Sequence, residues 1–242
     1  MQMNAVILAA GKGTRLNSVI NDIPKPMVKV GTKPILEQNI IWLRDNGIRN
    51  IYINLHQFPD SIRDYFDTGS NWDTDIKYSY EPELLGTSGA VNKIASDYWS
   101  TQSPESAFIV VYGDNILSDF NLAEIIKFHN ERKGLATICL FYRDDVSQSG
   151  IAVLDDNSRI LRFIEKPTPE QCVSHLVNTG IYIMEPEILK YIPSGFSDFG
   201  RDIFPCLLEA NETLYGIVSD KTVTAIDTPQ LLQQAIGKGG SV

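Results

Sequence analysis

A glycine-rich loop near the start of the chain carries residue types that can bind a phosphate group. An apolar run, Asn4–Ala10, precedes Gly11-Lys12-Gly13-Thr14-Arg15-Leu16, and Pro24-Lys25-Pro26 follows. Two glycines one residue apart let the backbone approach a ligand, and successive loop N–H groups can point at phosphate oxygens. Arg15 and Lys25 add positive charge. These residues predict an anion site at the carboxyl end of a first strand, where open α/β sheets bind ligands.

Two common phosphate-binding motifs do not match this loop. A dinucleotide-binding loop has a third glycine where this chain has Leu16, and the Walker pattern G-x-x-x-x-G-K-[ST] is absent. The G-x-G pair alone could be only a tight turn. The longer pattern L-A-A-G-x-G-T-R-L, followed by K-P, is much more specific and favours a nucleotide-binding role.

A second candidate group is Asp114, which follows the strongest apolar run of the chain. Phe108–Asp114 is predicted to be a buried strand that ends in the carboxylate of Asp114. An aspartate at the carboxyl end of a central strand is often catalytic or binds a metal. Capping of the next helix is the alternative role for Asp114.

Three more segments carry polar side chains that could contact a ligand. They are Glu81-Pro82-Glu83-Leu84-Leu85-Gly86-Thr87-Ser88-Gly89-Ala90, Glu165-Lys166-Pro167 and Asn178-Thr179-Gly180. The hydroxyls between Gly86 and Gly89 could simply cap the following helix, or the segment could lie against a ligand. In isolation, Glu165 and Lys166 would be interpreted as a solvated charge pair at the end of a strand.

Taken together, these segments resemble the sugar-1-phosphate nucleotidylyltransferases, also called nucleotide-sugar pyrophosphorylases. The resemblance extends over about residues 4–234. It rests on L-A-A-G-x-G-T-R-L, L-G-T-x-G-A, E-K-P and N-T-G-I-Y. The L-G-T-x-G-A segment resembles the mannose- and heptose-1-phosphate guanylyltransferases, and R-L-x-S-V-x-x-D-x-P-K-P-M resembles the heptose-1-phosphate guanylyltransferases more than the glucose-1-phosphate thymidylyltransferases. The resemblance implies an enzyme that makes an NDP-sugar and pyrophosphate from an NTP and a sugar 1-phosphate.

The resemblance also implies catalytic roles. Arg15 would hold the departing pyrophosphate, Lys25 the α-phosphate, and Lys166 the phosphate of the sugar, with Asp114 as the fourth catalytic residue. Mg²⁺ is the implied cofactor, bound by Asp114 and Asp227. The family motif D-x-G-T-P is shortened here to Asp227-Thr228-Pro229, and helix capping alone would explain Asp227.

Two sets of binding residues follow from the same resemblance. The nucleotide-binding set comprises Leu8, Ala9, Ala10, Gly11, Gly13, Thr14, Arg15, Lys25, Glu81, Glu83, Gly86, Thr87 and Ser88. The sugar-phosphate-binding set comprises Gly150, Glu165, Lys166, Asn178 and Thr179.

The base preference is predicted from two carboxylates. Glu81 and Glu83 stand where relatives that transfer thymidylyl or uridylyl groups usually have glutamine. A carboxylate only accepts hydrogen bonds, so it suits the adjacent N1–H and N2–H₂ donors of guanine. We therefore expect GTP ahead of UTP and CTP, with either glutamate as the residue that reads the base.

The elements that position these residues follow an α/β pattern. Strands are predicted over 4–10, 50–55, 76–80, 108–114, 135–142, 150–154, 160–164, 176–184, 214–218 and 223–226, and helices over 34–46, 59–66, 91–99, 122–133, 186–191, 202–209 and 229–236. Strands and helices alternate up to about residue 133, and the following region is rich in strands. This predicts a Rossmann-like, doubly wound, mixed and mostly parallel sheet with a small β-rich sugar-binding portion, as in the nucleotide-diphospho-sugar transferase fold.

The domain organisation expected from this pattern is simple. We expect one nucleotidyltransferase domain over residues 1–242, with a nucleotide-binding half over about 1–133 and a sugar-phosphate-binding half over about 134–236. Many relatives carry a C-terminal left-handed β-helix. No hexapeptide-like repeat occurs here, so we expect no such domain.

The composition limits which binding partners and which cellular compartment are expected. The net charge of −9 argues against nucleic acid or an anionic membrane surface as a partner, since both require broad basic patches. The 3 cysteines form no C-x-x-C pair, and neither a signal peptide nor a membrane-spanning run is evident, so a cytoplasmic location is expected. The expected partners are the NTP and the sugar 1-phosphate, and a homodimer is compatible with the resemblance.

Two alternatives remain open at this point. The chain could be a uridylyl-, cytidylyl- or thymidylyltransferase acting on another sugar 1-phosphate. It could also be a non-catalytic nucleotide-sugar-binding protein that kept the fold, although such a sensor would not need all of the charged site residues. The E-K-P and N-T-G segments argue against a molybdenum-cofactor nucleotidyltransferase that shares only the glycine-rich loop.

Overall fold

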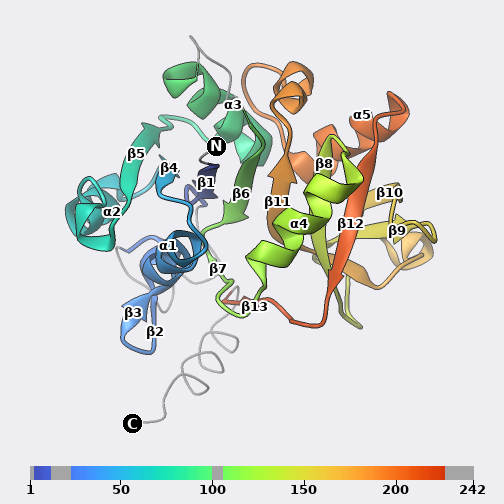
Figure 1. Ribbon diagram of the computed structural model, residues 1–242, viewed down its shortest axis with the longest axis horizontal. Helices are drawn as coiled ribbons and strands as arrows, with labels where there is room; N and C mark the ends of the chain where they lie inside the picture. The colour runs from blue at the N-terminus through green and yellow to red at the C-terminus, as the bar shows by residue number, and fades with distance from the viewer. Residues whose placement is uncertain (1–2, 12–22, 100–105, 227–242) are drawn as a thin grey trace. The chain divides into compact units, whose positions relative to one another are not determined.

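The computed structural model describes residues 3–11, 23–99 and 106–226 (Figure 1). The chain forms two compact units. The first unit comprises Met1–Leu84, Val111–Asp119 and Val223–Val242, and the second comprises Leu85–Val110 and Phe120–Thr222. These units interleave along the chain, whereas the predicted nucleotide and sugar halves were separated by a single boundary.

A parallel sheet forms the centre of the first unit. Its strands are β1 (Asn4–Leu8), β4 (Asn50–Leu55) and β5 (Asp75–Tyr80), and β1 and β5 each pair with β4 in parallel. The side chains of Ala5, Val6 and Ile7 are fully buried, which explains the apolar run of β1. Because β1 ends at Leu8, Ala9 and Ala10 belong to the loop rather than to the predicted strand.

The end of β6 (Phe108–Tyr112) lies against β1 in the same unit. Gly113 N donates a hydrogen bond to Leu8 O over 2.9 Å. A Cβ atom on Gly113 would lie 2.9 Å from Ile7 Cγ2, so a larger residue would push the two strands apart. Glycine at this position therefore lets the chain bring Asp114 close to the start of the glycine-rich loop.

Helices and short strands complete the first unit. The helices are α1 (Ile35–Asp45), α2 (Pro59–Phe66) and the 3₁₀ turns η2 (Lys25–Met27) and η3 (Ser70–Trp72). Two small antiparallel pairs were not predicted in this form: β2 (Lys29–Val30) with β3 (Lys33–Pro34), and β7 (Asn115–Ile116) with β13 (Thr224–Ala225).

The second unit is built mainly from antiparallel strands. They are β8 (Ala136–Tyr142), β9 (Gly150–Leu154), β10 (Ile160–Glu165), β11 (Leu176–Met184) and β12 (Leu214–Ser219). The strand β11 pairs in antiparallel fashion with both β8 and β9, β10 pairs in the same way with β9, and β12 pairs in parallel with β8. The predicted hairpin of residues 150–154 and 160–164 is confirmed.

Helices cover parts of this sheet. The elements are α3 (Gly86–Tyr98), α4 (Leu122–Arg132), α5 (Phe204–Glu209), the 3₁₀ turns η4 (Pro169–Gln171) and η5 (Pro186–Tyr191), and a π-helical turn η6 (Phe199–Ile203). In Figure 1, α4 lies across β8 and β12, and it contacts both strands. Tyr182, Phe199 and Phe204 are buried and pack ring against ring beside the carboxyl end of β10.

Most predicted elements are confirmed, and two differ in a way that bears on the site. The helix predicted over 91–99 begins at Gly86, so the G-T-S-G segment forms its first turn. The helix predicted over 202–209 is preceded by the turn η6. The carboxylate of Asp198 caps the start of η6. The helix predicted over 229–236 lies outside the described residues.

The α/β class with a β-rich second portion agrees with the prediction. Within the part of the chain that the structure describes, no helix has both the length and the apolar character needed to cross a membrane.

Candidate active site

A partly buried ion pair joins two of the predicted catalytic residues. Lys25 begins the turn η2 between two prolines, and its side chain is only 7% exposed. Its Nζ donates to Asp114 Oδ2 over 2.6 Å, and the Asp114 side chain is 31% exposed. Folding thus brings the K-P segment after the glycine-rich loop to the carboxylate that follows β6. The pair places the ammonium group of Lys25 beside a partly accessible carboxylate.

The described part of the glycine-rich loop runs from Ala9 to Gly11. Ala9 and Ala10 are buried, and Gly11 is exposed. Among the described residues, no atom lies within 4 Å of the position a Cβ on Gly11 would take. The predicted site residues Gly13, Thr14, Arg15 and Asp227 lie outside the described residues.

A chain of hydrogen bonds connects this loop to one of the two candidate base-reading glutamates. Ala9 N donates to Asn54 Oδ1 over 2.6 Å, and Asn54 Nδ2 donates to Glu81 Oε1 over 2.8 Å. Glu81 is 1% exposed, whereas Glu83 is exposed. The backbone carbonyl of Glu81 accepts from His56 Nδ1 over 2.8 Å. Of the two carboxylates, Glu81 is therefore the one that points into the protein.

Asn54 was missed by the sequence analysis. It is 3% exposed at the carboxyl end of β4. A polar residue inside the apolar run Ile51–Leu55 was the signal that could have found it, since a buried amide requires partners.

The G-T-S-G segment is held against residues 195–199 within the second unit. A Cβ on Gly86, which has a φ of +74°, would collide with the carbonyl oxygen of Ser197. Thr87 Oγ1 donates to Asp198 Oδ2 over 3.0 Å and accepts from Phe199 N over 2.9 Å. Ser88 is fully buried, and its Oγ donates to Ser197 Oγ over 2.7 Å. Both hydroxyls predicted to face the nucleotide therefore have partners within the protein.

Two members of the predicted sugar-phosphate set meet at the end of the β9–β10 hairpin. Glu165 pairs with Gly150 across the two strands. Glu165 Oε2 lies 2.6 Å from where a Cβ on Gly150 would be and 2.5 Å from the corresponding position on Gly200. Burial and then the nearby Asp198 carboxylate raise the pKa of Glu165, although Lys166 and Arg201 act in the opposite direction.

The other members of this set are held by backbone and side-chain contacts. Lys166 has a positive φ of 49°, and its N donates to Ser149 O over 3.0 Å. Asn178 Nδ2 donates to Tyr182 Oη over 2.6 Å, and Asn178 Oδ1 accepts from Gly180 N over 2.8 Å. Thr179 is fully buried and donates to Cys139 O over 2.9 Å, so its hydroxyl points into the core.

With this geometry described, the comparisons with known proteins identify the family. Residues 4–223 match the family described as "Nucleotidyl transferase". The chain belongs to this family. The match includes every predicted site residue except Asp227.

Curated relatives align with most of this chain. A UTP–glucose-1-phosphate uridylyltransferase of Synechocystis sp. is 37% identical over 90% of the chain and 58% of its own length. A protein of Oryza sativa subsp. japonica named probable mannose-1-phosphate guanylyltransferase 1 is 31% identical over 89% of the chain and 59% of its own length. The chain thus spans less than two thirds of these relatives.

Solved structures confirm the fold. The crystal structure of HddC from Yersinia pseudotuberculosis complexed with GMP-PN has a TM-score of 0.79 and is 28% identical, covering 99% of this chain and 100% of that one. A putative glucose-1-phosphate thymidylyltransferase from Bacillus anthracis has a TM-score of 0.86 at 23% identity, covering 99% of this chain and 96% of that one, which supports the fold alone. The fold class predicted from the sequence is therefore confirmed.

The residues that could hold a metal in this family member are few. Within residues 3–11, 23–99 and 106–226, no group of three or more histidine, cysteine, aspartate or glutamate side chains could hold a metal ion. Mg²⁺ commonly uses only one or two protein carboxylates together with substrate phosphates. The partly exposed Asp114 is compatible with that manner of binding.

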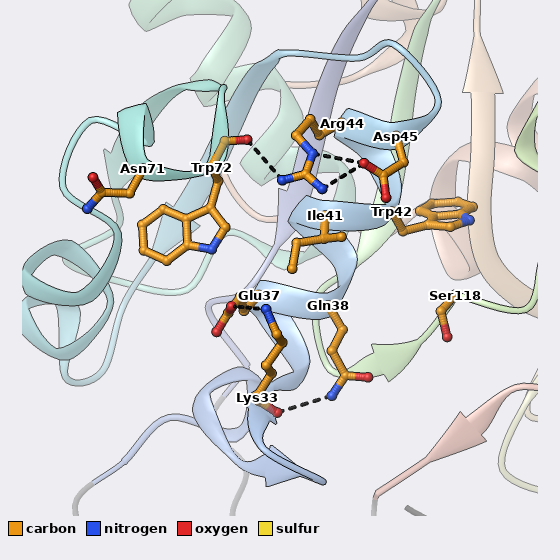
Figure 2. A pocket seen from close by; sticks show the side chains of 10 residues that line it. All are labelled: Lys33, Glu37, Gln38, Ile41, Trp42, Arg44, Asp45, Asn71, Trp72 and Ser118. Atoms are coloured by element: carbon orange, nitrogen blue, oxygen red, sulfur yellow. Dashed lines mark hydrogen bonds and ion pairs between the residues drawn. The ribbon is translucent and has the colours of Figure 1, made fainter.

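A separate cavity of about 880 Å³ lies along α1 in the first unit (Figure 2). None of the predicted site residues lines it; the lining residues are Lys33, Glu37, Gln38, Ile41, Trp42, Arg44, Asp45, Asn71, Trp72 and Ser118. Glu37 accepts from Lys33 Nζ and from Tyr65 Oη, each over 2.8 Å. Burial opposes ionisation of Glu37, but hydrogen bonds from Lys33, Tyr65 and Trp72 together lower its pKa. The charged groups of this cavity are thus paired within the protein.

Proposed function

We propose that this chain transfers a nucleotidyl group from an NTP to a sugar 1-phosphate and releases pyrophosphate. The observation that carries the proposal is the contact of 2.6 Å between Lys25 Nζ and Asp114 Oδ2. It joins a cation, which follows the glycine-rich loop in the sequence, to a carboxylate at the strand edge where ligands of α/β sheets bind. Membership of the nucleotidyl transferase family and relatives named for sugar-1-phosphate substrates support the same activity.

The chemistry requires little proton transfer. A phosphate oxygen of the sugar 1-phosphate is already anionic at neutral pH, so it attacks the α-phosphorus of the NTP without a general base. The new bond joins that oxygen to the α-phosphorus, and the bond from the α-phosphorus to the bridging oxygen of the β-phosphate breaks. The electron pair leaves with pyrophosphate. Catalysis then consists of positioning and charge neutralisation.

The basic residues have separate roles in this proposal. Lys25 neutralises charge at the α-phosphate, Arg15 holds the leaving pyrophosphate, and Lys166 orients the attacking phosphate. Gly11 and Gly13 let the loop backbone approach the phosphates. Ala9, Ala10 and Thr14 are further nucleotide-binding residues of this loop in the proposal.

We propose Mg²⁺ as the cofactor, with Asp114 and Asp227 as its protein ligands. When bound, the ion would neutralise charge on the reacting phosphates. Asp114→Asn is expected to abolish metal-dependent turnover while the protein stays folded, because an amide binds a hard cation poorly. If the folded variant still requires Mg²⁺ for turnover, Asp114 is only the ion-pair partner of Lys25 and is not a metal ligand.

We propose GTP as the preferred nucleotide and Glu81 as the residue that reads the base. Support comes from the burial of Glu81 and from relatives named as mannose-1-phosphate guanylyltransferases. HddC, which has been crystallised with GMP-PN, adds to this support. The uridylyltransferase of Synechocystis makes UTP the nucleotide that must be tested against GTP.

We propose that the carboxylate of Glu165 and the amide of Asn178 bind sugar hydroxyls. Gly150 would leave room for the sugar, and Thr179 would act through its backbone. Mannose- or heptose-1-phosphate is the sugar substrate that the guanylyltransferase resemblance favours. A cytoplasmic location, a homodimer and the division into halves at about residue 133 stay predictions.

The experiment that tests the activity is pyrophosphate release over a panel of nucleotides and sugar 1-phosphates. GTP, UTP, CTP and dTTP are each paired with mannose-, heptose- and glucose-1-phosphate in the presence of Mg²⁺. Pyrophosphate formation with any pair supports the reaction. Tight binding of NDP-sugars without turnover of any pair would instead favour the non-catalytic alternative.

A further inference from the structure

Asn54 connects the start of the glycine-rich loop to Glu81, and these two parts of the first unit have different roles in the proposed reaction. Its Oδ1 accepts from Ala9 N over 2.6 Å, at the residue where the glycine-rich loop leaves β1. Its Nδ2 donates to Glu81 Oε1 over 2.8 Å. All three residues are less than 5% exposed, since Ala9 is 4%, Asn54 3% and Glu81 1% exposed.

We propose that Asn54 is a positioning residue for nucleotide selection, which holds the Glu81 carboxylate ready for the base and in register with the phosphate loop. This inference rests on the proposed function, in which Glu81 accepts hydrogen bonds from guanine. Asn54 itself touches no reacting atom in this scheme. It acts through the orientation and charge of Glu81.

The chemistry of the amide explains why this residue type stands here. The oxygen of an asparagine side chain accepts and the nitrogen donates, so one side chain can serve a backbone N–H and a carboxylate at once. A hydrogen bond donated to a carboxylate favours its ionised form. An ionised carboxylate accepts the two adjacent donors of guanine, whereas a protonated one would turn a donor toward the base.

The connection to Ala9 makes a second contribution. The same amide plane fixes where the phosphate loop begins relative to Glu81, because Ala9 N and Glu81 Oε1 bond to opposite ends of one rigid group. The Asn54 side chain thus adds a direct link to the strand pairing of β1, β4 and β5, which holds the loop and Glu81 in register.

Asn54→Asp isolates the bond to Glu81. The aspartate keeps an oxygen that can accept from Ala9 N, but it loses the donor to Glu81 and places a second carboxylate beside the first. Asn54→Ala removes both bonds and adds no charge, so it replaces the aspartate variant if that variant does not fold. Asn50→Asp is the matched control, since Asn50 starts the same strand and its Nδ2 donates to Asn4 Oδ1 over 3.3 Å.

The readout is the ratio of kcat/KM for GTP to that for ITP, because inosine lacks the 2-amino donor of guanine. Asn54→Asp is expected to lower this ratio by about tenfold or more, the equivalent of one hydrogen bond to a charged group. Asn50→Asp is expected to leave the ratio unchanged. In a Glu81→Gln background, Asn54→Asp is expected to have no further effect on the ratio, since the two residues act as one unit.

The outcomes separate this inference from the function on which it rests. The GTP-to-ITP ratio of the wild-type protein could fall in Glu81→Gln but stay unchanged in Asn54→Asp and Asn54→Ala. That result would overturn the role of Asn54 and leave the role of Glu81 intact. Equal effects of Asn54→Asp in the wild-type and Glu81→Gln backgrounds would reduce Asn54 to a purely structural residue. Preference for UTP over GTP would overturn the base assignment together with this inference, and leave the reaction class intact.

If no nucleotide is turned over, the same ratio is measured as GTP and ITP affinities by calorimetry. A GTP preference that Asn54→Asp removes supports the positioning role in a binding protein. An absence of nucleotide binding by the folded wild-type protein would overturn the inference and the proposed function together.

Discussion

The two units hold their acidic residues in opposite electrostatic settings. In the first unit, Asp114 lies 2.6 Å from the ammonium of Lys25, and Glu81 accepts from the amide of Asn54. In the second unit, Glu165 lies between two glycine backbones, and burial together with Asp198 raises its pKa. The first setting provides a cation for anionic groups. The second provides acceptors and open space, which suit neutral hydroxyl groups.

This difference suggests how an acidic chain could bind the two anionic substrates that we propose. In the first unit, the turn η2 places the buried ammonium of Lys25 beside Asp114. The glycines beside Glu165 leave room that any Cβ would fill. Charge placement therefore distinguishes the proposed phosphate site from the proposed sugar site better than the overall composition does.

The strongest way to break this comparison is to remove the cation of the first unit. Lys25→Ala is expected to lower kcat/KM by about 10²–10³-fold, the scale of losing one electrostatic contact in a transition state. Pyrophosphate release measures it, and melting curves verify the fold. Lys33→Ala is the control, because Lys33 is 48% exposed and pairs with Glu37 instead. Equal losses in both variants would contradict a specific role for Lys25.

The second unit is tested by Glu165→Gln. The amide can accept only at one atom, so one hydroxyl of the sugar loses its acceptor, and we expect KM for the sugar 1-phosphate to rise about tenfold. KM for the NTP should stay unchanged. Glu170→Gln is the control, as Glu170 lies in η4 and is exposed. A rise in KM for the NTP alone would move Glu165 to the nucleotide.

The raised pKa of Glu165 gives a separate prediction about stability. The folded protein keeps the proton of Glu165 to a higher pH than the unfolded chain does. Wild-type protein should therefore lose stability relative to Glu165→Gln as pH rises from the unfolded pKa through the folded pKa. Melting temperatures of both proteins, compared at acidic and neutral pH, measure this. A difference that is independent of pH would contradict the electrostatic setting described for Glu165.

The smallest expected effect concerns the hydroxyl of Ser88. Ser88→Ala removes its bond of 2.7 Å to Ser197 Oγ. We expect the free energy of unfolding to fall by about 1 kcal/mol, the usual net value of a hydrogen bond, with KM for the NTP unchanged. Urea denaturation and steady-state kinetics measure the two quantities. If stability is unchanged and KM for the NTP rises, the Ser88 hydroxyl contacts the nucleotide, as the sequence predicted.

Local pattern predicted the elements of this protein well. Apolar runs and their spacing identified β1, β4, β5, β6 and the β9–β10 hairpin, because alternation and helical period depend on residues close in the chain. The error at α3 was also local. The helix was predicted to begin at residue 91, after Gly86 and Gly89. Both glycines instead lie in its first turn, where the carbonyls of Ser197 and Gly195 leave no room for a Cβ.

By itself, the sequence determined the strand and helix pattern, the family and the list of candidate site residues. Only the tertiary structure decided which polar groups meet. Lys25 and Asp114 are 89 residues apart, Ala9 and Asn54 are 45 apart, and Ser88 and Ser197 are 109 apart. It also decided that Glu81 rather than Glu83 is buried. The physical reason is that hydrogen-bond partners of buried groups come from segments that folding brings together, and no local period records those pairings.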